Sequence, residues 1–288
     1  PVGADSTFPF KQHRDIFYLT GIDQEETILL LSPQAKELKN RAILFIKKTD
    51  KKIQIWEGQK LSKEDARLIS GIDKIFWLNE FDSTLKKITS QNKGIYFNKN
   101  EHYRNNSETQ TREDRFIIKF KKKYPDLVVH RSNPILQHLR SIKDPLEINQ
   151  IKRACEVTEM GFRRILKFIK PDTWEYEIEA ELLHEFISNR SKGFAYSPII
   201  ASGKNANILH YIKNNSQCKS GELVLIDSAA EYGNYCSDLT RTIPVSGRYN
   251  NRQKAIYNAV LNVKKEATTL LTPGNLWKKY HEEVGKIM

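Results

Sequence analysis

The segment Leu223-Val-Leu-Ile-Asp227, followed after a short polar stretch by Asp238-Leu-Thr-Arg-Thr-Ile-Pro-Val245, decides how this chain is expected to fold. Both stretches are rich in Val, Ile, Leu and Thr, the residues that favour strands. Gly233-Asn234 between them is a turn signal. We therefore predict a β-hairpin with an aspartate at the end of its first strand and another at the start of its second.

The turn decides how these two aspartates face each other. With Tyr232-Gly233 as the turn, Asp227 and Asp238 are directly opposed, whereas with Gly233-Asn234 they are diagonal neighbours; both registers put them on one face. Like charges this close destabilise a sheet unless a cation bridges them. Hard carboxylate oxygens suit one or two divalent metals such as manganese, cobalt or zinc, so we predict a metal site here.

A competing interpretation treats the pair as two unrelated surface aspartates that flank a turn. The continuous apolar run into Asp227 argues against it, because a strand with one face in solvent would alternate polar and apolar residues. His210, in Ile208-Leu-His-Tyr211, lies a short way upstream. We take it as a candidate catalytic residue rather than a packed core histidine.

The composition is that of an ordinary globular protein long enough for two domains. Of 288 residues, 39% are hydrophobic and 28% are charged. The sequence contains no run of about 18 apolar residues, so it predicts no membrane-spanning helix. Cys155, Cys218 and Cys236 are odd in number and fit no zinc spacing, which favours free thiols in a reducing cytoplasm.

The net charge of +12 would suit a nucleic-acid partner. Lysines cluster at positions 47–48, 51–52 and 121–123, but these clusters lie in separate predicted elements and lack the interleaved aromatic residues of single-strand binders. We interpret the charge as a solvated surface, and we predict neither a nucleic-acid partner nor a membrane partner.

Residues 1–140 are predicted to form a mixed α/β domain in which strands outnumber helices. Ser62, followed three residues later by Asp65, predicts a helix N-cap. The predicted strands are Ile16–Thr20, Thr27–Leu31, Ala42–Lys47, Lys52–Glu57, Lys74–Leu78, Gly94–Phe97 and Leu127–Val129. The predicted helices are Lys63–Ser70, Ser83–Ser90 and Arg112–Tyr124.

Residues 141–288 are predicted to form a second domain. Asp144 and Pro145 indicate the N-cap and first turn of a long helix that ends at the Pro171-Asp172 break. A second helix is expected from about Tyr176 to Asn189. The strands that follow are expected to carry Tyr196, His210, Asp227 and Asp238, and further helices are expected from Arg252 to about Leu271 and from about Leu276.

Several separated motifs agree in order and spacing with one known family. In the second domain they are Pro171-Asp-Thr-Trp-Glu-Tyr-Glu-Ile-Glu-Ala180, Ser202-Gly203, Ile208-Leu-His-Tyr211, Leu225-Ile-Asp227 and Ser237-Asp238-Leu-Thr-Arg-Thr242. In the first domain they are Thr7-Phe-Pro-Phe-Lys-Gln12 and Phe17-Tyr-Leu-Thr-Gly21. Over nearly its whole length the chain resembles the M24 metallopeptidases, and within them most closely those of the Xaa-Pro aminopeptidase (aminopeptidase P) type.

The resemblance implies an α/β (α+β) fold: a mixed α/β N-terminal domain of the creatinase/aminopeptidase P type, then the first part of a pita-bread catalytic domain. In that family two Asp from this half, and a His and two Glu from the following half, hold two metals. This sequence reaches Met288 before those three ligands, and His281-Glu-Glu283 lies on a predicted helix and does not match. We therefore expect a C-terminally incomplete metallopeptidase domain whose remaining ligands are absent from this chain.

The resemblance also assigns roles to the candidate residues. Asp227 would chelate one metal, Asp238 would bridge both, and a hydroxide between the metals would attack the carbonyl before a proline. His210 would hydrogen-bond the substrate and the tetrahedral intermediate. Tyr196 and Thr240 would line the pocket or donate to the ligating carboxylates. The implied cofactor is two divalent ions, manganese with cobalt or zinc as alternatives.

The function implied is that of a cytoplasmic metallo-aminopeptidase which releases an N-terminal residue that precedes proline. Its partners would be peptides with proline at the second position, and the resemblance implies a homo-oligomer, either a dimer or a tetramer. Two alternatives stay open: a prolidase that cleaves Xaa-Pro dipeptides, and a catalytically inactive, peptidase-like binding module. For the 288-residue chain alone we expect no appreciable turnover.

Overall fold

The computed structural model describes residues 8–102 and 108–288 and divides into two compact units, residues 1–143 and 144–288. Thr7, the first residue of the N-terminal motif, lies outside the described residues. Within the described ranges, no helix combines the length and the apolar composition that crossing a membrane requires.

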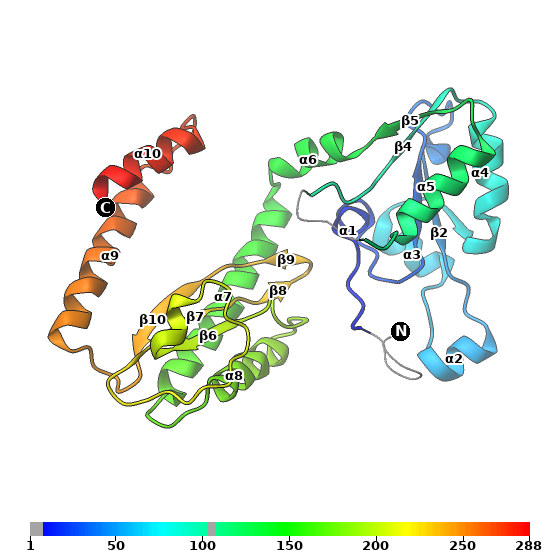
Figure 1. Cartoon of the computed structure of the whole chain (residues 1–288). Helices are drawn as coiled ribbons and strands as arrows, with labels where there is room; N and C mark the ends of the chain where they lie inside the picture. The colour runs from blue at the N-terminus through cyan, green and yellow to red at the C-terminus, as the bar shows by residue number, and fades with distance from the viewer. Residues whose placement is uncertain (1–7, 103–107) are drawn as a thin grey trace. The chain divides into compact units, whose positions relative to one another are not determined.

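The first unit contains two small sheets with helices around them (Figure 1). In one sheet β1 is antiparallel to β2 and β2 is parallel to β3; in the other, β4 is parallel to β5, and α5 forms the crossover. The strands are β1 Ile28–Leu31, β2 Ala42–Ile46, β3 Lys74–Trp77, β4 Gly94–Phe97 and β5 Val128–Arg131. The helices are α1 Arg14–Thr20, α2 Lys51–Glu57, α3 Lys63–Ser70, α4 Phe81–Thr89, α5 Arg112–Lys123 and α6 Asn133–Ser141, with short 3-10 turns η1 Leu38–Asn40 and η2 Leu78–Glu80.

Most predicted elements of this unit are confirmed, but two predicted strands are wrong. The expectation that strands outnumber helices is therefore wrong as well, since the described residues of this unit form five strands and six α-helices. Ile16–Thr20 belongs to α1, which ends at Gly21 in a left-handed conformation, and Lys52–Glu57 belongs to α2. The side chain of Asp50 caps α2 by accepting from the backbone N–H of Ile53 at 2.8 Å. Over so few residues, alternating apolar side chains fit a short helix as well as a strand, and here the cap decides. Helix α6 was not predicted.

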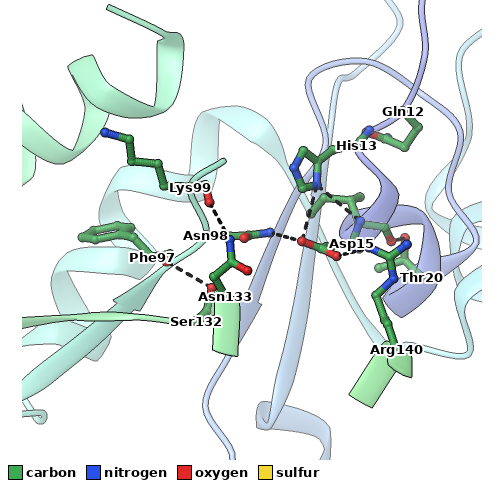
Figure 2. Close-up of polar contacts among 11 residues, drawn as sticks. Gln12, His13, Asp15, Thr20, Phe97, Asn98, Lys99, Ser132, Asn133 and Arg140 are labelled. Carbon is green, nitrogen blue, oxygen red and sulfur yellow. Dashed lines mark hydrogen bonds and ion pairs between the residues drawn. The ribbon is translucent and has the colours of Figure 1, made fainter. Parts of the chain in front are cut away.

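Asp15 ties α1 to two segments far along the chain (Figure 2). Its carboxylate accepts from Asn98 Nδ2 at 2.8 Å and from Arg140 Nη1 at 2.6 Å. Beside it, the hydroxyl of Ser132 donates to the carbonyl of Phe97 at 3.0 Å, so the start of α6 is held against the end of β4. The carboxylate of Asp15 therefore joins three parts of the unit: helix α1, helix α6 and the residue that follows strand β4.

The second unit begins with a long helix whose predicted start is confirmed. Asp144 Oδ1 accepts from the backbone N–H of Glu147 at 2.8 Å, and Pro145 occupies the first helical position. The helices are α7 Pro145–Phe168, α8 Glu175–Ser188, α9 Asn251–Thr269 and α10 Trp277–Ile287, with α10 folding back along α9 (Figure 1). The strands are β6 Ile199–Ser202, β7 Leu223–Asp227, β8 Glu231–Tyr232, β9 Tyr235–Cys236 and β10 Thr240–Pro244; η3 spans Gly203–Asn207.

Strand β7 is the centre of an antiparallel sheet with the order β10-β7-β6. Val224 and Ile226 are fully buried in the main core, together with side chains of α7 and α8. Leu225, on the opposite face, packs with Ile199, Ala201 and Tyr211. Asp227 shares the face of Leu225 because side chains alternate along a strand. The aspartate therefore lies on the sheet face turned away from α7 and α8.

Candidate metal and catalytic site

The hairpin that carries the two aspartates has the second of the two predicted registers. Thr240 pairs with Asp227 in β10–β7, and Tyr232 pairs with Tyr235 in the β8–β9 ribbon. The turn is therefore Gly233-Asn234, and both residues have the positive φ that this tight turn requires, 56° and 66°. Asp238, two residues before Thr240, is a diagonal neighbour of Asp227.

Three of the predicted site residues do not lie on strands, which corrects the expectation. Asp238 precedes β10, Tyr196 precedes β6, and His210 lies in a turn between η3 and β7. Backbone hydrogen bonds still flank Asp238, from the N–H of Ser228 to the carbonyl of Leu239 at 3.1 Å and from the N–H of Ser237 to the carbonyl of Ala230 at 3.2 Å. The preceding residue, Ser237, is buried. Its hydroxyl is 2.6 Å from Thr158 Oγ1 of α7 and 3.1 Å from the carbonyl of Ala230.

One hydroxyl nevertheless joins both carboxylates. Tyr196 Oη lies 2.6 Å from Asp227 Oδ1 and 3.2 Å from Asp238 Oδ1. Asp227 and Tyr196 are half-buried, whereas Asp238 is exposed. Burial, followed by the hydrogen bond to Asp227 and the charges of both aspartates, raises the pKa of Tyr196 far above its ordinary value. The phenol therefore keeps its proton and is a donor that the two carboxylates share.

Thr240 shares a sheet face with Asp227, because the two residues are direct cross-strand partners. Its side chain is exposed, and within the described residues its hydroxyl makes no hydrogen bond to Asp227 or Asp238. The structure thus places Thr240 beside the first aspartate. Its role toward the ligands stays a prediction.

His210 is exposed, and within the described part of the chain no hydrogen bond or ion pair joins it to either aspartate. Its neighbour Tyr211 is buried, 6% exposed, and packs with Ile199 and Ala201 on the face that carries Asp227. The structure thus brings Tyr196, Asp227 and Asp238 into contact and anchors His210 through the next residue.

The donor set fits a hard divalent cation only in part. Two carboxylates that converge on one hydroxyl are oxygen ligands of the kind manganese and zinc accept in dinuclear sites. Within residues 8–102 and 108–288, however, no group of three or more His, Cys, Asp or Glu residues could hold a metal ion. Among the described residues the two aspartates therefore supply only two side-chain ligands to a divalent cation, and the metal site itself stays a prediction.

Sequence reasoning missed Glu175, the first residue of α8. Its side chain is fully buried, and its carboxylate accepts five hydrogen bonds from the segment that surrounds His210. An acidic residue in a helix's first turn usually signals favourable interaction with the helix dipole, which needs no burial. The available signal was its place in the motif Pro171–Ala180, which resembles the M24 helix-opening segment.

Comparisons of the sequence with known proteins agree over both units. Residues 149–288 match the pattern described as metallopeptidase family M24, and residues 1–96 match that of the aminopeptidase P N-terminal domain. The chain is 34% identical over 283 residues to the Xaa-Pro aminopeptidase of Haemophilus influenzae, covering 98% of this chain and 63% of that protein. It is 30% identical to the Xaa-Pro aminopeptidase of Escherichia coli, covering 99% of this chain and 65% of that protein.

Comparison of the structure with solved structures points the same way. The chain superposes on a Bacillus anthracis protein described as an aminopeptidase P with a TM-score of 0.92 and 35% identity, covering 99% of this chain and 68% of that one. In the sequence comparison, the chain spans less than two thirds of the length of the two curated relatives, the Xaa-Pro aminopeptidases of Haemophilus influenzae and Escherichia coli. The likeness confirms the predicted fold class, a mixed α/β N-terminal domain followed by the start of a pita-bread domain.

Proposed function

The chain belongs to metallopeptidase family M24 and carries the N-terminal domain of aminopeptidase P. From this premise we propose that it functions as a metal-dependent aminopeptidase, which releases an N-terminal residue that precedes proline. The observation that carries the proposal is the convergence of Asp227 and Asp238 on the hydroxyl of Tyr196. Two carboxylates on one sheet face, with one of them exposed, are available to a divalent cation.

Each residue has a distinct part in this proposal. Asp227 and Asp238 hold two divalent ions, manganese with cobalt or zinc as alternatives, together with ligands outside the described residues. Such ions activate water at neutral pH and polarise the scissile carbonyl. Tyr196 orients the carboxylates by donating to them, and His210 hydrogen-bonds the substrate carbonyl. Thr240 lines the same face.

The proposed substrates are peptides with proline at the second position, in line with the names of the two curated relatives. We place the reaction in the cytoplasm, because the three cysteines, Cys155, Cys218 and Cys236, are odd in number and fit no zinc spacing, as is common in a reducing compartment. We also propose that the protein works as a homo-oligomer, a dimer or a tetramer.

The test is an assay of the longest natural product of this gene for manganese-dependent release of the first residue from Xaa-Pro-Xaa tripeptides. Asp238→Ala should abolish both activity and high-affinity manganese binding, because it removes one of the two carboxylates that would hold the metal. Glu282→Ala is the matched control, since Glu282 is an exposed acidic residue of α10.

The outcomes separate the candidate functions. Activity retained in Asp238→Ala would refute the metal role of that residue. Cleavage of Xaa-Pro dipeptides alone would select a prolidase, and a metal-loaded protein that cleaves neither substrate would select the inactive binding module.

A further inference from the structure

The connection between β6 and β7, which carries His210, is held by a buried carboxylate rather than by a strand. Glu175 is 0% exposed. Its Oε1 accepts from the backbone N–H of Ser202 at 2.7 Å, from the hydroxyl of Ser202 at 2.8 Å and from Asn205 Nδ2 at 3.2 Å. One carboxylate oxygen therefore fixes the beginning of the connection.

The other oxygen of Glu175 fixes its far end. Oε2 accepts from the hydroxyl of Tyr211 at 2.7 Å and from the backbone N–H of Ser216 at 2.9 Å. An ionised carboxylate accepts hydrogen bonds and donates none, so five donors satisfy the buried charge. Burial, with Glu175 acting in the same direction, raises the pKa of Tyr211, and the phenol therefore stays protonated as the donor.

A second side chain of the connection is fixed to the same helix. Asn214, 3% exposed and with a φ of 45°, donates from Nδ2 to Glu179 Oε2 at 2.8 Å and to the carbonyl of Pro198 at 3.0 Å. Its Oδ1 accepts from the backbone N–H of Ile200 at 3.0 Å. Glu175 and Glu179 lie one turn apart on α8, so one helix face clamps the connection at several points.

The clamp reaches His210 through its neighbour. Tyr211 has its ring packed against Ile199 and Ala201, on the sheet face of Asp227, and its hydroxyl bonded to Glu175. His210, one residue earlier, stays exposed. With Tyr211 fixed at both its ring and its hydroxyl, the backbone that presents the imidazole is fixed relative to that face.

We propose that Glu175 is a positioning residue of this enzyme, which acts through Tyr211 to hold His210 over the sheet face that carries Asp227. The inference rests on the proposed function, because it assigns His210 to substrate binding. Glu175 itself touches no reacting atom and is not a catalytic residue. Through its hydrogen bond to Tyr211, Glu175 links the start of α8 to the residue next to His210.

The test uses Tyr211→Phe, which leaves Glu175 four of its five donors and also removes the longer contacts of the same hydroxyl with Asn205, Asn215 and Ser216. Glu175→Gln would set an amide N–H₂ against buried donors and endanger folding. In the longest natural product, Tyr211→Phe should lower kcat by about tenfold through misplacement of His210. Tyr249→Phe is the matched control: it likewise removes a tyrosine hydroxyl of the second unit, one that donates to the carbonyl of Thr242 at 2.8 Å. We expect it to leave kcat within about twofold of wild type.

The discriminating readout is a double-mutant cycle with His210→Ala, assayed at enzyme concentrations high enough to quantify the loss. If Tyr211 acts through His210, adding Tyr211→Phe to His210→Ala should cause little further loss. Independent, multiplicative losses would overturn the inference, as would an unchanged kcat in Tyr211→Phe. An inactive wild-type protein would overturn the proposed function and this inference with it, whereas an additive cycle in an active protein overturns the inference alone.

Discussion

Asp227 and Asp238 show a conflict between stability and metal binding at the scale of single residues. The hydroxyl of Tyr196 has one proton but lies within hydrogen-bond distance of two carboxylates. It can therefore donate a full hydrogen bond to only one of the two aspartates at a time. Without metal, Asp238→Asn should raise the free energy of unfolding by about 0.5 kcal/mol, because it removes a like charge and adds an amide donor beside Asp227. Urea unfolding in the presence of a chelator measures this change.

A control is needed because the chain carries a net charge of +12, and removal of any negative charge adds to its self-repulsion. Glu282→Gln, at an exposed position of α10, reports that general effect alone. Asp238→Asn should be more stable than Glu282→Gln in chelator, and added manganese should stabilise Glu282→Gln more. Equal unfolding midpoints of the two variants in chelator would show that the carboxylates do not repel each other.

At the scale of elements, α7 and α8 pack closely because α7 has a glycine at their contact. A Cβ built on Gly161 would lie 2.6 Å from Phe186 Cε1 and 3.1 Å from Leu182 Cδ2. Both side chains are fully buried, so neither can swing away. Gly161→Ala should therefore destabilise the protein by about 1–3 kcal/mol through overpacking, despite the better helix propensity of alanine. The urea midpoint measures the effect.

Gly285→Ala is the matched substitution, since Gly285 lies in α10 and a Cβ there would meet nothing within 4 Å. It should stabilise the protein slightly, by at most about 1 kcal/mol, through helix propensity alone. If both variants were stabilised, the tight contact between α7 and α8 would not exist in solution.

The same elements show how far local sequence reaches. The start of α7 could be predicted because Asp144, Pro145 and Glu147 form their cap within one turn. Helix α2 is predicted as a strand although Asp50 and Gly58 bound it, because Ile53 and Ile55 alternate with polar residues. A short pattern of this kind fits both periods, so caps carry more information than apolar spacing in such segments.

For the candidate site, the hairpin pattern limited Asp227 and Asp238 to two registers, and the left-handed turn Gly233-Asn234 fixed one of them. The burial of Glu175 could not be foreseen, because its donors come from positions 202–216. Contacts so distant in sequence depend on how α8 meets the sheet. No local pattern contains that information.

At the scale of the whole molecule, the candidate site belongs to one unit. Tyr196, Asp227 and Asp238 all lie in residues 144–288, as do Glu175 and the connection it holds. The first unit has its own core of Ile22, Leu44, Ile46, Ala66 and Ile75. Each unit can therefore be stable by its own packing, while metal binding should report on the second unit alone.

The 288-residue chain by itself should bind manganese weakly and turn over no Xaa-Pro peptide, because no third ligand joins the two aspartates within the described residues. With a dissociation constant of about 1 mM, manganese at about 1 mM would stabilise the second unit by about 0.4 kcal/mol. That corresponds to a rise in Tm of about 1–2 °C. Thermal unfolding with and without manganese measures it, and Asp238→Asn provides the baseline. A rise of many degrees that Asp238→Asn abolishes, or turnover equal to that of the longest natural product, would show that these residues complete the site unaided.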